Sequence, residues 1–135
     1  MFLFDTDVLS NLTRKRPAQS LLAKLARTHQ EDCFTSSITL AEIYYGLQKW
    51  PDRKEIVARL EEKVFPLFVV FDFDESSAKC YGEIRAHLER KGQTRDDLDL
   101  QIAAIALQHR LTLVTGNVKH FRGIPGLVVE NWLGS

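Results

Sequence analysis

The chain has 135 residues, a length that suits one domain with a substantial core, so we expect residues 1–135 to form a single domain. Apolar residues make up 44% and charged residues 27%, and 18 basic side chains balance 18 acidic ones, so the net charge gives no reason to expect a nucleic-acid partner. The sequence holds only two cysteines, no run that approaches membrane-spanning length and no signal peptide at its start, which favours a cytoplasmic protein without a membrane partner.

The N-terminal segment predicts a strand and two helices. The apolar run Phe2–Phe4 predicts a short strand, and it ends in Asp5-Thr6-Asp7, where short polar side chains are typical of a helix start. A first helix carries apolar residues as far as Leu12 and fades in the polar segment after it. Pro17 is well placed to begin a second helix.

The next segment repeats this order. Cys33–Ser36 predicts a second strand, and Thr39 opens a helix whose apolar residues have the spacing of one buried face. Glu42 falls in the first turn of that predicted helix, and Pro51 stops it. A further amphipathic helix is predicted over residues 52–64.

A third strand and helix follow. The continuous apolar run at residues 67–73 is the strongest strand signal in the chain and favours a strand buried on both faces. Ser76 or Ser77 begins the next predicted helix, and Gly92 supplies its C-cap.

Residues 94–117 combine an acidic opening, a helix and a strand. Residues 102–107 are apolar all round, which predicts a helix that packs on a sheet and is covered from outside. The run at residues 111–115 contains Val and Thr and predicts a buried strand, reached through a tight turn at residues 109–110. Residues 127–129 predict a last strand at the sheet edge.

This order of elements predicts an α/β fold. Helices that return the chain to the next strand imply a parallel sheet, so we expect a three-layer α/β/α sandwich around a central, mainly parallel sheet. In such a sheet the carboxyl ends of the strands and the starts of the helices share one rim, where ligands bind.

Three acidic residues are expected on that rim. Asp5 ends the first strand, Glu42 lies near the start of the helix after the second, and Asp99 opens the helix before the fourth. Crowded carboxylates repel one another unless a cation neutralises them, and hard oxygen ligands suit Mg²⁺ or Mn²⁺. Thr115 and Asn117, at the end of the fourth strand, would add neutral polar groups beside them.

Each acid also has a purely structural interpretation, which the sequence leaves open. Asp5 fits a helix N-cap, and Thr39 with Glu42 fits a capping box. Asp99, three residues after Asp96, fits an ordinary acid of a first helical turn.

The chain resembles the PIN-domain nucleases, specifically the VapC-type toxins of prokaryotic toxin-antitoxin pairs. The resemblance covers nearly the whole chain and rests on four motifs in the expected order. They are Phe4-Asp5-Thr6-Asp7-Val8-Leu9-Ser10, Thr39-Leu40-Ala41-Glu42-Ile43-Tyr44-Tyr45-Gly46, Asp99-Leu100-Gln101-Ile102-Ala103-Ala104 and Leu113-Val114-Thr115-Gly116-Asn117-Val118-Lys119-His120-Phe121.

The resemblance implies a Mg²⁺-dependent endoribonuclease that hydrolyses RNA phosphodiester bonds. It implies that Asp5, Glu42 and Asp99 hold the metal and carry catalysis, with Thr6 and Asn117 assisting. In one respect this chain departs from the family, since His120 stands where many members have an aspartate.

The same resemblance implies a homodimer silenced by a small VapB-type antitoxin in its active-site groove. The sequence itself favours dimerisation, because Tyr44, Tyr45 and Trp50 add aromatic surface to helices that a small sheet cannot fully cover.

Two other function classes remain as alternatives. Phe4-Asp5-Thr6-Asp7 also looks like the start of haloacid-dehalogenase-like phosphatases, in which the first Asp is the nucleophile, although the later Lys and acidic pair are incomplete here. A binding module that keeps the fold but has weak catalysis is the other alternative, and His120 is its best support.

Overall fold

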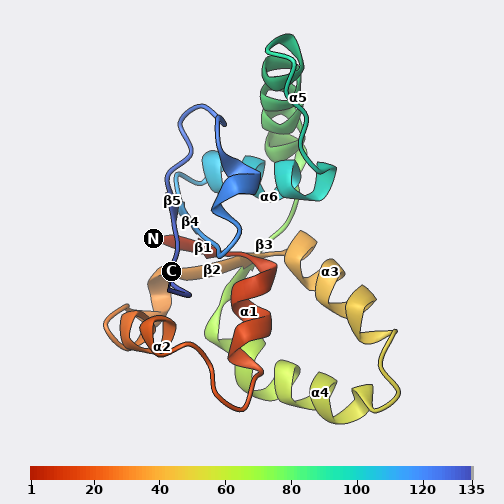
Figure 1. The fold of residues 1–135 in the computed structure, drawn as a ribbon, viewed down its shortest axis with the longest axis vertical. Coiled ribbons are helices and arrows are strands. Elements are labelled where there is room, and N and C mark those ends of the chain that lie inside the picture. The colour runs from red at the N-terminus through yellow and green to blue at the C-terminus, as the bar shows by residue number, and fades with distance from the viewer. Residues whose placement is uncertain (135) are drawn as a thin grey trace.

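A computed structural model describes residues 1–134 and shows five parallel strands in the order β3-β2-β1-β4-β5 (Figure 1). All four pairings between neighbouring strands are parallel, for example Leu3 beside Leu113 and Phe34 beside Val69. The strands are β1 Phe2–Phe4, β2 Cys33–Ser36, β3 Val69–Phe71, β4 Thr112–Val114 and β5 Val129–Glu130.

Six α-helices connect and cover these strands in the part of the chain that is described. They are α1 Thr6–Leu12, α2 Gln19–Ala26, α3 Ser37–Leu47, α4 Arg53–Arg59, α5 Glu75–Arg90 and α6 Asp97–Gln108. Short turns of other helix types are η1 Gln30–Asp32, η2 Leu60–Val64, η3 Phe65–Leu67 and η4 Val118–Phe121. The predicted order of strands and helices is therefore confirmed. Within residues 1–134 no helix is both long and apolar enough to cross a membrane.

The helices form a layer on each side of the sheet, which confirms the predicted α/β/α sandwich. Adjacent strand residues point to opposite layers, because side chains alternate along a strand. Leu3 and Leu113 pack with α5 and α6, whereas Phe4 and Val114 pack with residues of α1, α2 and α3. In Figure 1, α5 and α6 lie above the sheet and α1, α2 and α4 lie below it.

Helix α6 is the best covered of these elements. The residues from Ile102 to Ala106 are all fully buried. The helix lies against β4 on one side and against α5 on another. The prediction of a helix that is apolar all round because it is covered from outside is confirmed.

The prediction that residues 67–73 form a strand buried on both faces is wrong. Only Val69–Phe71 is a strand, and it lies at the sheet edge, paired with β2 alone. Val69 is 52% exposed, while Phe68 packs in the core and Phe71 stacks on Phe34. The residues of this apolar run therefore lie in three different environments. Their burial depends on the order of strands in the sheet, which a local sequence pattern does not reveal.

Several helix starts also differ from the prediction. Helix α5 begins at Glu75 and not at Ser76 or Ser77, because the Asp74 carboxylate accepts the Ser77 N–H at 2.9 Å and is the N-cap. Helix α3 begins at Ser37 because the Ser36 hydroxyl accepts the Thr39 N–H at 3.0 Å, so Ser36 is the N-cap. Helix α2 begins at Gln19, after Pro17. Gly92 has a positive φ of 69° directly after the α5 C-cap Lys91, as its predicted capping role requires.

Candidate active site

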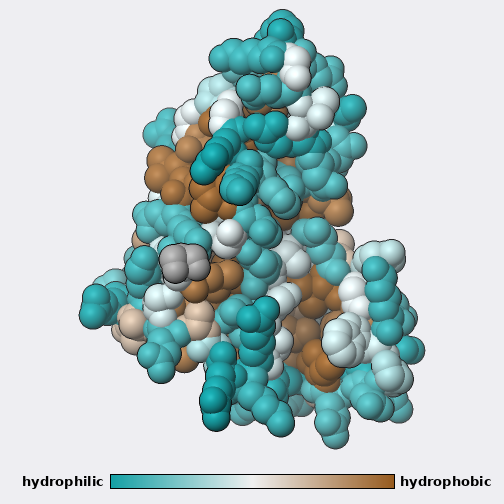
Figure 2. Space-filling model, viewed as in Figure 1, coloured by the Kyte–Doolittle hydropathy of each residue, from teal (hydrophilic) through white to brown (hydrophobic). Residues whose placement is uncertain are grey.

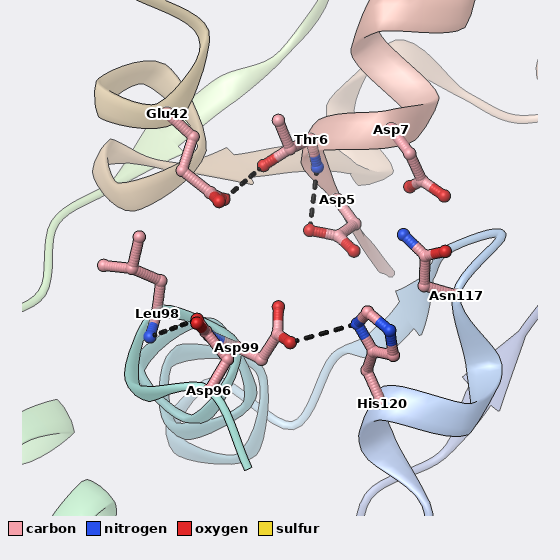
Figure 3. Close-up of a pocket in the computed structure, with 9 residues that line it drawn as sticks. All are labelled: Asp5, Thr6, Asp7, Glu42, Asp96, Leu98, Asp99, Asn117 and His120. Atoms are coloured by element: carbon pink, nitrogen blue, oxygen red, sulfur yellow. Dashed lines mark hydrogen bonds and ion pairs between the residues drawn. The ribbon is translucent and has the colours of Figure 1, made fainter. Parts of the chain in front are cut away.

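The carboxyl ends of β1 and β4 and the first turns of α1 and α6 enclose a polar cavity of about 390 Å³ (Figure 3). The predicted residues Asp5, Glu42, Asp99 and Asn117 all line it. The complete lining is Asp5, Thr6, Asp7, Glu42, Asp96, Leu98, Asp99, Asn117 and His120. Five of the nine are acidic and none is Lys or Arg, so the cavity favours a cation.

Asp5 is the most deeply placed of the acids, with 4% of its surface exposed. Its Oδ1 accepts the Thr6 N–H at 2.8 Å, and its Oδ2 accepts the Thr115 hydroxyl at 2.7 Å. Burial raises the pKa of Asp5 from 3.8 to about 7, against the lowering effect of the Thr115 hydrogen bond, and the charge of Asp7 raises it further. Asp5 is thus both the N-cap of α1 and a cavity carboxyl whose ionised form is disfavoured by burial.

Glu42 reaches the cavity from the second turn of α3, because that helix starts earlier than predicted. The capping box with Thr39 does not form, since Ser36 occupies the Thr39 N–H. Instead, Glu42 Oε1 accepts the Thr6 hydroxyl at 2.6 Å. A contact between α3 and α1 therefore aims Glu42 toward Asp5, and its structural interpretation as a cap is wrong.

Asp99 lies in the first turn of α6 and points across the cavity toward His120. The helix is capped by Asp96, whose Oδ1 accepts the N–H groups of Leu98 and Asp99 at 2.9 and 3.3 Å. Asp99 Oδ2 lies 3.2 Å from His120 Nδ1. Burial raises the pKa of Asp99, the Asp96 charge adds to this, and His120 lowers it.

Thr115 and Asn117 have different roles from each other. Thr115 is fully buried and does not line the cavity, but its hydroxyl lies 2.7 Å from Asp5 Oδ2 and 3.4 Å from Asp7 Oδ1. Asn117 lines the cavity from the loop after β4, and its N–H donates to the Thr115 hydroxyl at 3.0 Å.

Four lining residues were not predicted as site residues from the sequence: Asp7, Asp96, Leu98 and His120. Asp7 Oδ2 accepts the Gly116 N–H at 2.8 Å, and burial raises the pKa of Asp7. A Cβ at Gly116 would lie 2.7 Å from that oxygen, so any other residue there would force the Asp7 carboxylate to shift. Asp7 could have been predicted as a site residue, because it lies two residues after Asp5 in the first turn of the same helix. The His120 side chain is 56% exposed, yet it faces Asp99.

The donor set fits a hard divalent cation. Asp5, Asp99 and Glu42 offer carboxylate oxygens and Asn117 an amide oxygen, the ligands that suit Mg²⁺ and Mn²⁺. In residues 1–134 no three His, Cys, Asp or Glu side chains already converge tightly enough to hold an ion. Asp99 and His120 are one pair of ligand types that already lie side by side there, 3.2 Å apart.

The chain is similar to one protein family in sequence and in structure. A family model described as PIN domain matches residues 2–127. Ribonuclease VapC2 of Rickettsia felis is 36% identical over 140 residues, covering 98% of both chains. The tRNA(fMet)-specific endonuclease VapC of Salmonella typhimurium is 33% identical over 133 residues, covering 97% of both. The crystal structure of VapBC2 from Rickettsia felis, bound to a DNA fragment from their promoter, contains a chain with a TM-score of 0.86 and 33% identity, covering 97% of this chain and 98% of that one.

Proposed function

Because the chain belongs to the PIN-domain family, among the VapC ribonuclease toxins of toxin-antitoxin systems, we propose that it hydrolyses RNA phosphodiester bonds at the cavity around Asp5, Glu42 and Asp99. It is a ribonuclease of the endonuclease type, as its relatives are named. We propose that residues 1–135 form one nuclease domain and that it acts on RNA in the cytoplasm.

One observation supports the site most strongly. Asp5 is buried beside two other acids, and burial raises its pKa to about 7, so its carboxylate is costly without a neutralising cation. Asp5 and Asp99 would hold Mg²⁺ or Mn²⁺, with Glu42 close by. When bound, such an ion supplies Lewis-acid chemistry that lowers the pKa of a water and offsets phosphate charge.

The side chains around the acids would position the reactants. Thr6 holds Glu42 through a 2.6 Å hydrogen bond, and Thr115 holds Asp5 through one of 2.7 Å. Asn117 adds a neutral amide at the cavity wall, suited to a phosphate oxygen or a water.

Cleavage of a mixed RNA pool by the purified protein tests this function. We expect cleavage with Mg²⁺ or Mn²⁺, none after chelation, and recovery when the metal is restored. The Asp99→Asn variant should be inactive, and His29→Gln, on the exposed surface away from the cavity, should match the parent. Full cleavage in excess chelator, or by Asp99→Asn, would refute the assignment.

The phosphatase alternative is not supported. It requires a Lys near the Asp5 carboxyl, and no Lys lines the cavity among residues 1–134. The binding-module alternative depends on the cleavage assay above, since it predicts metal binding without cleavage.

We propose an antitoxin as the protein partner, docked in a groove beside the acidic cavity. The groove measures about 300 Å³, is mostly apolar, and shares Thr6 and Glu42 with the cavity. Figure 2 shows hydrophobic side chains in this hollow, between the α1, α3 and α4 positions of Figure 1. An amphipathic segment in the groove could place a basic side chain against Asp5, Glu42 and Asp99. No residue of α2 lines this groove in the part of the chain that the structure describes.

We also propose a homodimer. Tyr45 and Trp50 are 67% and 60% exposed at the end of α3 and after it, and exposed aromatic side chains of this kind mark interfaces.

A further inference from the structure

The wall of the cavity opposite Glu42 carries a nitrogen donor beside a carboxylate. Asp99 comes from α6 and His120 from η4, and both side chains point into the same space (Figure 3). His120 Nδ1 and Asp99 Oδ2 are 3.2 Å apart. Of the four histidines in the chain, His120 is the one that lines the cavity within residues 1–134.

This separation suits two ligands of one ion. Neighbouring donors around an octahedral cation, each roughly 2.1 Å from it, lie about 3 Å from each other. Asp99 Oδ2 and His120 Nδ1 are already near that distance. Both atoms could therefore contact one cation with little movement of either side chain.

The chemistry of the pair differs from that of the rest of the cavity. Mg²⁺ prefers oxygen ligands and binds imidazole weakly, whereas first-row transition ions accept imidazole nitrogen readily. Asp5, Glu42 and Asn117 offer oxygen only. His120 thus makes one side of the cavity favour transition-metal ions over Mg²⁺, which a fourth carboxylate would not do.

We propose that Asp99 and His120 form an oxygen–nitrogen subsite that favours a divalent transition-metal ion over Mg²⁺. The inference rests on the proposed function, because it assumes that the cavity holds a cation. It assigns His120 as a metal ligand, so that the metal preference of this chain depends on one side chain.

Electron spin-echo spectroscopy with Mn²⁺ as the probe tests the assignment directly. The protein is stripped of metal and loaded with Mn²⁺, and imidazole nitrogen coupling to the ion is recorded. We expect the coupling in the parent and in the His29→Gln control, and its loss in His120→Asp and His120→Gln. By calorimetry, the preference for Mn²⁺ over Mg²⁺ should fall about tenfold in His120→Asp.

The outcomes separate this inference from the proposed function. Bound Mn²⁺ without imidazole coupling, in a protein that still cleaves RNA, overturns the subsite and leaves the nuclease intact. An unchanged ratio of Mn²⁺ to Mg²⁺ affinity in His120→Asp overturns it as well. Absence of any divalent-ion binding together with absence of cleavage overturns both. Far-ultraviolet circular dichroism shows whether each variant is folded, and His120→Gln serves if His120→Asp is not.

Discussion

Thr115 donates a hydrogen bond from its buried hydroxyl to Asp5 Oδ2 at 2.7 Å, which ties the carboxyl end of β4 to that of β1. The bond fixes the direction of the Asp5 carboxylate and lowers the pKa of Asp5, while burial raises it. Thr115 touches no cavity space itself, so it acts as a positioning residue for Asp5.

Thr115→Val should therefore weaken metal binding without changing the volume of the cavity, because Val and Thr are similar in size and Thr115 does not line the cavity. Loss of the hydroxyl raises the pKa of Asp5 further and frees its carboxylate to rotate, so we expect metal affinity to fall about tenfold at neutral pH. Calorimetric titration with Mn²⁺ measures this. Thr115→Ser keeps the hydroxyl and should bind nearly as the parent does, and equal affinity of the valine variant would refute the positioning role.

Asp5→Asn and Asp99→Asn should each lower cleavage by about two orders of magnitude or more while the fold persists. Both remove a charge from a crowded acidic cavity, so in the absence of metal each variant should melt at or above the temperature of the parent. Thermal melts in chelator check the second point. A fall of several degrees with activity retained would show that Asp5 serves only as a helix cap and Asp99 only as an acid of a first helical turn.

The stability of the metal-free protein should decrease as pH rises from about 4 to about 7. Asp5 has a folded pKa of about 7 against 3.8 in the unfolded chain, so between these values the folded state binds more protons and unfolding becomes easier with rising pH. The total effect of this one group is about 4 kcal/mol and levels off above pH 7. The raised pKa values of Asp7 and Asp99 act in the same direction.

Urea unfolding in chelator across this pH range measures the effect. Asp5→Asn lacks the titrating group and should show a clearly smaller decrease. Identical pH profiles for the parent and Asp5→Asn would contradict the raised pKa of Asp5.

An inhibitor that inserts a basic side chain among Asp5, Glu42 and Asp99 should compete with the metal. High Mg²⁺ should then weaken inhibition of cleavage by the cognate antitoxin, because both cations occupy the same acidic space. Replacing the inserted basic residue of the antitoxin by Ala should restore cleavage even where the complex still forms. Inhibition that is insensitive both to Mg²⁺ and to every basic residue of the inserted segment would exclude competition at the site.

The sequence determined the order of the elements and the edge at which the site lies. Short apolar runs, Pro17 and Gly92 act locally, so strands and helices could be placed to within a few residues. A parallel sheet brings strand ends and helix starts to one rim whatever the strand order is, which is why Asp5 and Asp99 could be assigned to the same cavity.

Only the tertiary structure decided which side chains meet. The edge position of β3 depends on the order of strands in the sheet, to which residues 67–73 contribute no local signal. The bond from Thr6 to Glu42 and the approach of His120 to Asp99 join segments that are far apart in the chain. Such contacts depend on how whole helices pack against the sheet. The spacing of apolar residues in the sequence cannot predict them, because it describes only one helix at a time.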